Sequence, residues 1–163
     1  MKKIILIAFF SLQIIEVIAQ KGAPILPYKA AYSSSYEMTN NKYSAVIMNI
    51  WKEFGNNNFS NFPGYFADTV QLQRLTGEYK GSRDNFIGVL SSVRGRYKAF
   101  DTKIDAIFSF RSTDKKSDWV SVYGYEYTED NNGKRDTTNL HELWEFNKNG
   151  KVSFISQYAR KSH

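Results

Sequence analysis

Apolar and polar residues alternate with a period of two along most of the last third of the chain. Alternating runs cover residues 119–129, 135–147 and 151–160, and two short sequences separate them, Asn131-Asn132-Gly133 and Asn149-Gly150. Asn-Gly between alternating runs is a strong signal for a β-hairpin. The pattern therefore predicts three antiparallel strands in succession.

Two segments before these strands have helical periodicity. Residues 41–56 form the first, with Trp51 beside a stripe of apolar residues at helical spacing: Tyr43, Val46, Ile47, Ile50 and Phe54. The second begins after Ser82, a favourable N-cap residue, and its expected buried stripe consists of Phe86, Val89, Leu90, Val93 and Tyr97.

Shorter signals occupy the remaining positions. Residues 59–66 predict an aromatic turn or a short helix, and residues 68–73 alternate like a strand. Residues 102–111 predict a longer strand with one apolar face, made of Ile104, Ala106, Phe108 and Phe110. Because helices come first and strands last, the order predicts a single α+β domain.

Residues 1–19 have the pattern of an export signal. Two lysines precede a mostly apolar run at residues 4–15, and the small residues before Gln20 suit cleavage after Ala19. The run is shorter than the about 20 apolar residues that span a bilayer. We therefore expect a bacterial protein that is exported to the periplasm or secreted, without a membrane anchor once the signal is removed.

The segment that follows the signal lacks any sustained period. Residues 20–40 contain two prolines and a serine triplet, which predicts an extended linker. We expect the folded domain to cover residues 41–163.

Composition excludes several kinds of chemistry. The chain has no cysteine, which rules out disulfides, thiol catalysis and cysteine-ligated zinc. Only one histidine, His141, lies away from the C-terminus. Phosphate-binding loops, nucleophile elbows and dinucleotide fingerprints are all missing from the sequence. We therefore expect no metal site and no cofactor.

The formal net charge of +6 is spread along the chain. Scattered charges are typical of a solvated surface. The basic cluster at residues 94–98 has no nucleic-acid recognition motif beside it. We expect no nucleic-acid partner.

The order helix, aromatic turn, short strand, glycine, helix and four long strands resembles the nuclear transport factor 2-like superfamily, and more narrowly its SnoaL-like branch. The resemblance covers residues 41–160, and the matching residues are Tyr65-Phe66-Ala67-Asp68-Thr69-Val70, Gly81-Ser82, Gly150-Lys151-Val152 and Tyr158. It implies a cone-shaped, curved antiparallel sheet wrapped around the N-terminal helices (the nuclear transport factor 2-like or cystatin-like α+β fold), with a pocket at the open end. Members include isomerases, cyclases, dehydratases, hydrolases and many non-catalytic proteins, so the fold alone does not select a function.

The last hairpin sorts its side chains onto two faces. If Asn149-Gly150 is a two-residue turn, Glu142 lies opposite Gln157, and His141 lies opposite Tyr158. One face then carries Leu140, Glu142, Trp144, Phe146, Ile155 and Gln157. This face is the more apolar of the two, so we assign it to the concave, helix-covered side.

Glu142 is the strongest candidate for a catalytic residue. A carboxylate among apolar neighbours such as Trp144 is desolvated, which raises its pKa and suits a general acid or base. Gln157 could orient this carboxylate or a ligand oxygen. The alternative is a structural carboxylate bonded to Gln157 or to an arginine. If the two faces are reversed, His141 and Tyr158 become the leading pair in the pocket.

The preceding hairpin leaves a second carboxylate open. A three-residue loop at residues 131–133 places Val122 opposite Glu142 and brings Glu126 to the concave side. A two-residue loop would replace them with Tyr123 and Tyr125. The resemblance favours the first alternative, in which the tyrosines form an outer face suited to protein contacts.

Three further residues are candidates for the pocket lining. The resemblance implies that the acid at Asp68 lies near the pocket mouth, although an Asp before a strand is also a turn residue. Tyr65 and Tyr79 could direct hydroxyl groups into a pocket or serve as core or rim aromatics.

These features support three functional hypotheses. The leading hypothesis is a pocket domain that binds a small hydrophobic or aromatic molecule without turnover. The second is a cofactor-free isomerase, cyclase or dehydratase that uses a pocket carboxylate. The third is an interaction module that forms a homodimer through the outer face of the sheet.

Overall fold

The computed structural model describes residues 27–161 of the chain. The chain divides into two units, residues 1–31 and residues 32–163. The sheet and the helices belong to the second unit. The expected export signal, residues 1–19, lies outside the described residues. Within residues 27–161, no helix combines the length and apolar character that crossing a membrane requires.

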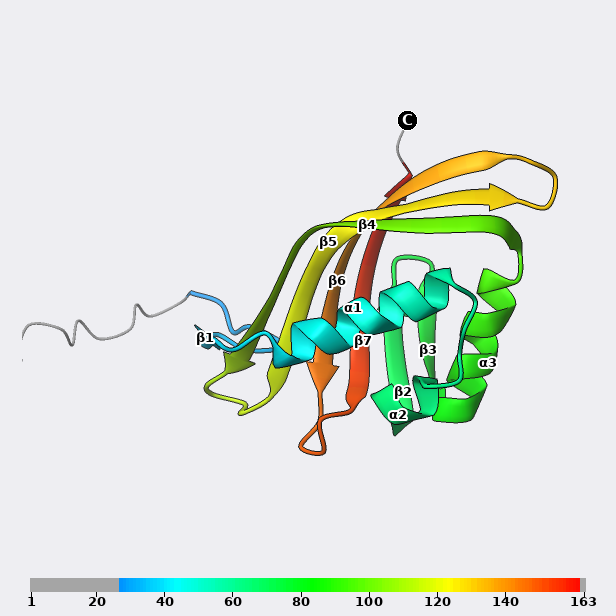
Figure 1. Cartoon of the computed structure of the whole chain (residues 1–163). Coiled ribbons are helices and arrows are strands. Elements are labelled where there is room, and N and C mark those ends of the chain that lie inside the picture. The colour runs from blue at the N-terminus through cyan, green and yellow to red at the C-terminus, as the bar shows by residue number, and fades with distance from the viewer. Residues whose placement is uncertain (1–26, 162–163) are drawn as a thin grey trace, which may run out of the picture. The chain divides into compact units, whose positions relative to one another are not determined.

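The described part of the second unit forms one seven-stranded sheet and three helices. The strands are β1 (Tyr36–Met38), β2 (Phe66–Arg74), β3 (Gly77–Ser82), β4 (Tyr97–Ser112), β5 (Asp118–Asp130), β6 (Arg135–Phe146) and β7 (Val152–Lys161). The helices are α1 (Lys42–Gly55), α2 (Phe62–Tyr65) and α3 (Arg83–Arg94). Figure 1 shows α1 lying across one face of the sheet while β4 and β5 bend over it. The predicted α+β class, with a curved sheet around the N-terminal helices, is confirmed.

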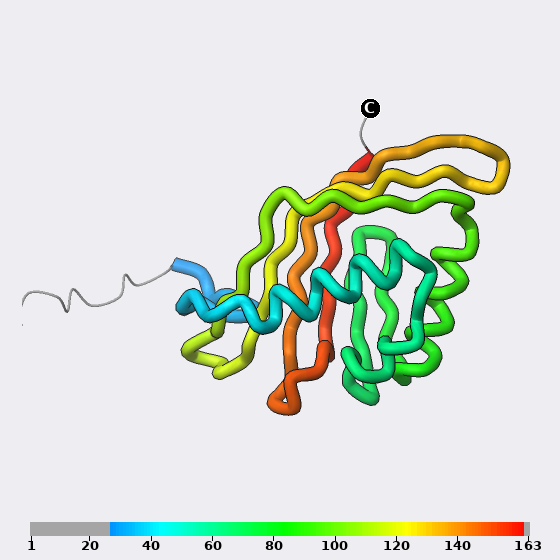
Figure 2. The backbone as a smooth tube through the Cα atoms, in the orientation of Figure 1, coloured from blue at the N-terminus to red at the C-terminus, as the bar shows by residue number. Residues whose placement is uncertain are grey.

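The sheet is mixed rather than wholly antiparallel, which corrects the sequence-based expectation. Its strand order is β1-β4-β5-β6-β7-β2-β3, and β2 pairs with β7 in parallel. The chain runs from the β2–β3 hairpin through α3 to β4 on the other side of the sheet, as the tube in Figure 2 shows. The last strand, β7, therefore pairs in parallel with β2, which lies far from it in the sequence. Periodicity within single strands does not reveal such long-range pairing.

The β5–β6 hairpin closes with the three-residue loop that the sequence left as one alternative. Asp130 and Lys134 bond to each other around residues 131–133, and Gly133 adopts a φ of 82° that favours glycine. Val122 therefore lies opposite Glu142.

The β6–β7 hairpin differs from its predicted two-residue turn. Asn147 pairs with Lys151 around residues 148–150, so the loop is one residue longer than expected. A one-residue shift would turn every following side chain to the other face. The shift is cancelled by a bulge at Ser153, after which Glu142 faces Gln157 as predicted.

A second bulge changes the faces of β4. Ile104 pairs with Gly124 and Ala106 pairs with Tyr123, which leaves Asp105 as an extra residue. The predicted single apolar face of Ile104, Ala106, Phe108 and Phe110 is therefore wrong. Beyond the bulge, Ile107 joins Ile104 against the core.

The chain joins the sheet earlier than expected. The segment expected to be an extended linker, residues 20–40, contains β1, whose three residues pair with the end of β4. The side chain of Ser33 is buried and bonds to Ser112. The folded unit thus includes residues before 41.

The core lies between the helices and the concave face of the sheet. From α1, it receives the buried side chains of Ile47, Ile50 and Trp51. The expected concave face is confirmed, because Leu140, Glu142, Trp144, Phe146 and Ile155 are all buried. The predicted stripe of α3 needs a correction: Phe86 is buried, but Val89 is exposed and Tyr97 belongs to β4.

Packing of α1 against the sheet should dominate the stability of the domain. The side chain of Ile47 is completely buried, whereas 41% of Val89 is exposed. Ile47→Ala should lower the free energy of unfolding by about 2–5 kcal/mol, as large-to-small core substitutions do. Val89→Ala should change it by less than about 0.5 kcal/mol. Urea unfolding of the two variants measures both values, and equal losses would contradict this packing.

Candidate functional site

A small cavity of about 80 Å³ lies between α1, α3 and the concave face of the sheet. Most of its wall is apolar, and its polar groups come from the helix α1 and from four strands, β4, β5, β6 and β7. The lining residues are Ile50, Trp51, Phe54, Leu72, Phe86, Leu90, Thr102, Glu126, Glu142, Trp144, Ile155 and Gln157. Of the predicted pocket residues, Glu126, Glu142, Trp144 and Gln157 are brought together here.

The carboxyl group of Glu142 is fixed by three N–H donors. The indole Nε1 atoms of Trp51 and Trp144 donate to Oε2 at 3.0 and 2.9 Å, and Nε2 of Gln157 donates to Oε1 at 2.6 Å. Only 4% of Glu142 is exposed. Burial raises the pKa of this carboxyl group, and the three donors oppose the rise because they stabilise the charged form.

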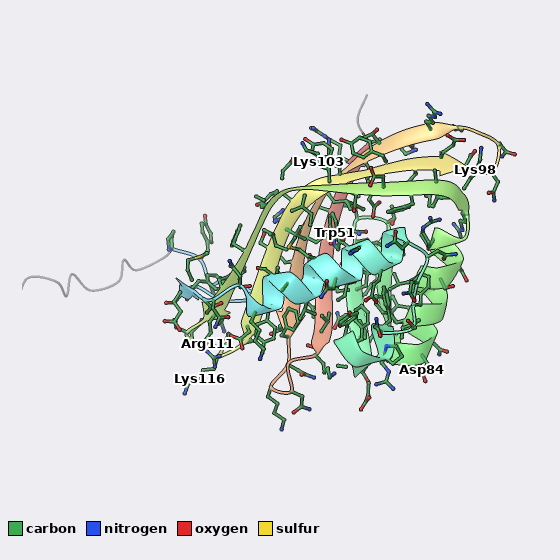
Figure 3. The ribbon with its side chains drawn as sticks, viewed as in Figure 1. Trp51, Asp84, Lys98, Lys103, Arg111 and Lys116 are labelled. Atoms are coloured by element: carbon green, nitrogen blue, oxygen red, sulfur yellow. The ribbon has the colours of Figure 1, made fainter. Side chains whose placement is uncertain are left out.

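Trp51 of α1 reaches Glu142 because its indole ring packs over Gly124 of β5, which has no side chain to block it. A Cβ atom added to Gly124 would lie 3.1 Å from the Trp51 ring and 2.3 Å from the backbone oxygen of Lys103. Figure 3 shows Trp51 on the side of α1 that faces the strands. The glycine therefore lets α1 approach closely enough for a helix residue to bond a strand residue.

Glu126 is the second carboxyl group of the cavity. It lies on the same face of β5 as Val122, opposite Thr102 of β4. No hydrogen bond joins its side chain to any of the described residues. Burial, and then the negative charge of Glu142, raise the pKa of Glu126 to about 8.

The two carboxyl groups therefore differ in what surrounds them. Glu142 holds three donors, whereas Glu126 has none, so Glu142 is the group that ionises first as the pH rises. At neutral pH Glu126 remains a carboxylic acid. A protonated acid in an apolar cavity can donate a hydrogen bond or a proton to a bound molecule.

Three predicted pocket residues lie outside the cavity. Tyr65 donates a hydrogen bond to Glu53 at 2.9 Å, and burial and this carboxylate raise the pKa of Tyr65. Asp68 is exposed and pairs with Arg83 at 3.1 Å. Tyr79 packs against Phe86 and donates to the backbone oxygen of Ser82, so it supports the cavity wall from behind.

His141 and Tyr158 lie on the outer face of the sheet, so the alternative with reversed faces is not realised. The ring of His141 stacks on Tyr123 with centroids 4.1 Å apart, and Tyr158 follows on its other side at 6.1 Å. Burial lowers the pKa of His141. The three rings form a row across β5, β6 and β7.

Sequence reasoning missed part of the site. Trp51 was predicted only to flank the apolar stripe of the first helix. Its hydrogen bond to Glu142 was missed because apolar periodicity contains no information about the indole N–H group. Thr102 was assigned to a strand without a role, and it faces Glu126 across β4 and β5. Leu72, Phe54 and Phe86 carry no signal that separates a cavity wall from an ordinary core.

The described residues do not bring three or more histidine, cysteine, aspartate or glutamate side chains into a cluster able to hold a metal ion. The polar side-chain groups that line the cavity are two carboxyls, two indole N–H groups, one amide and one hydroxyl.

The sequence matches no family model and no curated protein. Solved structures do match in fold. A putative SnoaL-like polyketide cyclase from Shewanella denitrificans aligns with a TM-score of 0.61 at 12% identity, covering 74% of this chain and 92% of its own. AusH from Aspergillus nidulans aligns with a TM-score of 0.60 at 12% identity, covering 78% and 89%. An LEH-like epoxide hydrolase from M. tuberculosis aligns with a TM-score of 0.57 at 13% identity, covering 72% of this chain and 82% of its own.

These likenesses agree with the resemblance found in the sequence. The chain has the fold of the nuclear transport factor 2-like superfamily, and structures of its SnoaL-like branch are among those it matches.

The raised pKa of Glu126 makes stability depend on pH in a defined direction. Its folded pKa of about 8 exceeds the ordinary value of 4.5. The folded protein therefore holds an extra proton between these values, and its stability falls as the pH rises through 8. The free energy of unfolding of the wild type, minus that of Glu126→Gln, should fall by about 1.4 kcal/mol per pH unit between about pH 5 and 8.

Glu129→Gln is the matched control on the same strand. Lys98 and Arg135 lower the pKa of Glu129, so its contribution changes only in acid. The corresponding difference for Glu129→Gln should be flat between about pH 5 and 8. Urea unfolding across this range tests both variants, and a flat difference for Glu126→Gln would contradict the assignment.

Proposed function

We propose that this chain is a pocket domain that binds a small, mostly apolar molecule in the cavity bounded by α1, α3 and the concave face of the sheet. The observation that carries the proposal is the cavity itself. Apolar side chains line most of it, and a few polar groups converge from different strands. This combination is typical of small-molecule sites.

The size of the cavity limits the ligand. At about 80 Å³ it is smaller than a cavity of about 150 Å³ that holds benzene. Drug-sized ligands occupy pockets of about 300–1,000 Å³. The proposed ligand is therefore a molecule with few non-hydrogen atoms, or the small end of a larger one.

The similar structures support a site of this kind only through the shared fold. Two of them are named as a polyketide cyclase and an epoxide hydrolase. At 12% and 13% identity these names do not transfer an activity to this chain. The proposal is one of binding, and it rests on the cavity.

The three tryptophans provide a direct test of binding. The indole N–H groups of Trp51 and Trp144 lie at the cavity, whereas that of Trp119 donates to Ser117 on the outer face. Titration with tert-butanol should shift the indole resonances of Trp51 and Trp144 in ¹H–¹⁵N NMR spectra and leave Trp119 unchanged. Because small ligands gain at most about 1.5 kcal/mol per non-hydrogen atom, millimolar concentrations are appropriate.

Two neighbouring positions of α3 give matched variants for this titration. Leu90 lines the cavity, and Val89 is exposed beside it. Leu90→Phe should fill the cavity and weaken tert-butanol binding at least about tenfold, whereas Val89→Phe should leave it unchanged. Saturable shifts that survive Leu90→Phe in a folded protein, or the absence of shifts in the wild type, would refute binding in this cavity.

A further inference from the structure

We propose that the ligand of the cavity is a small organic cation, of the alkylammonium class, held between the two carboxyl groups and the aromatic walls. This inference deepens the proposed function and rests on it. It follows from what the lining contains and from what it lacks.

The lining of the cavity contains acidic side chains and no basic ones. Glu126 and Glu142 are its only titratable carboxyl groups, and none of the lining residues, drawn from α1, α3, β2, β4, β5, β6 and β7, is basic. Three N–H donors replace the lost hydration of Glu142, whereas for Glu126 the described residues supply no donor, which leaves a proton or a cation to do so.

Basic side chains near the cavity are engaged elsewhere or exposed. The guanidinium of Arg94, at the end of α3, donates to the backbone oxygens of Gly55 and Tyr97. Arg74 lies beside Gln157 in the β2–β7 pairing but is exposed and does not line the cavity. The positive partner of the two carboxyl groups is therefore not supplied by the described residues of the lining.

Six carboxylates elsewhere in the described structure have a basic partner. Many surface carboxylates pair with a lysine or arginine of the chain, namely Asp68, Asp84, Asp105, Asp118, Glu129 and Asp136. The carboxyl groups of the cavity, where pairing would gain most, have no such partner. An external cation would complete the site.

The aromatic walls suit the same ligand. Trp51, Phe54, Phe86 and Trp144 line the cavity together with the two carboxyl groups. Aromatic rings attract ammonium groups through their electron-rich faces, and desolvation strengthens the attraction. The alkyl part of the ligand would contact Leu72, Leu90 and Ile155.

Cation binding should be linked to the ionisation of Glu126. The ligand favours the carboxylate form, so binding releases the proton that Glu126 holds at neutral pH, and affinity rises with pH. Thr102 lies opposite Glu126 on β4 and Thr138 lies opposite it on β6, while Glu142 of β6 and Trp51 and Phe54 of α1 line the same cavity. Among these neighbours only Glu142 carries a titratable group, and burial raises its pKa.

The test compares three molecules that share one skeleton: tert-butylammonium, tert-butanol and pivalate. Binding to the wild-type protein is followed through the indole resonances of Trp51 and Trp144 between pH 6 and 9. We expect tert-butylammonium to bind at least about tenfold more tightly than tert-butanol at pH 9, with an affinity that falls up to about tenfold per pH unit below pH 8. The chain's formal charge of +6 would favour pivalate, so a preference for the cation must arise locally.

Two variants separate the cavity from the surface. Glu126→Gln should reduce the preference for tert-butylammonium over tert-butanol at least about tenfold and abolish its rise with pH. Glu129→Gln, on the same strand but outside the cavity, should change neither.

Each outcome of this experiment decides something different. If tert-butanol or pivalate binds as tightly as tert-butylammonium, the cation proposal is wrong and the binding domain stands. If none of the three shifts the indole resonances, the proposed function fails and the cation proposal fails with it.

Discussion

The carboxyl group of Glu142, buried beneath α1, is the constraint on which the arrangement of this site depends. A buried carboxylate is costly unless donors surround it. Here the donors come from α1, β6 and β7, through Trp51, Trp144 and Gln157. Satisfying one group thus fixes the position of a helix against two strands. The same bonds occupy both of its oxygens, so Glu142 is better suited to hold the cavity's geometry and charge than to move.

That division of roles leaves Glu126 as the adjustable group. It shares the cavity with Glu142 but accepts no bond from the described residues, and the charge of its neighbour adds to its desolvation. Backbone irregularities make this arrangement possible. Gly124 admits the Trp51 ring, and the bulge at Asp105 turns Ile107 inward beside Ile104. The bond from Trp51 to Glu142 therefore depends on the missing side chain at Gly124, and the bulge changes which residues of β4 pack against the core.

Much of this site could be predicted from short-range patterns. Alternation in β6 and β7 and the Asn-Gly turns predicted the pairing of Glu142 with Gln157, the concave face and the possible entry of Glu126. The turn at Asn149-Gly150 was predicted one residue too short, and the pairing survived because Ser153 bulges. Such compensation involves the whole hairpin and has no local signal.

Other features depended on information that periodicity does not contain. The parallel contact of β2 with β7 joins distant parts of the chain, and it determines which of the early residues reach the cavity. Asp68 and Tyr65 were expected at the pocket and instead bond to Arg83 and Glu53. The family resemblance implied the fold correctly in outline, but a shared fold at such low identity does not determine which side chains line a cavity.

Glu126 and Glu142 share one cavity, and among the described residues N–H donors hold only Glu142. The most direct test is a carboxyl ¹³C NMR titration of Glu126 and Glu142 in the folded protein without ligand. Glu126 should titrate with a pKa of about 8, well above its ordinary value of 4.5. A Glu126 resonance that titrates near 4.5 would instead show that this side chain is solvated and not coupled to Glu142, and the proposed difference between the two carboxyl groups would be wrong.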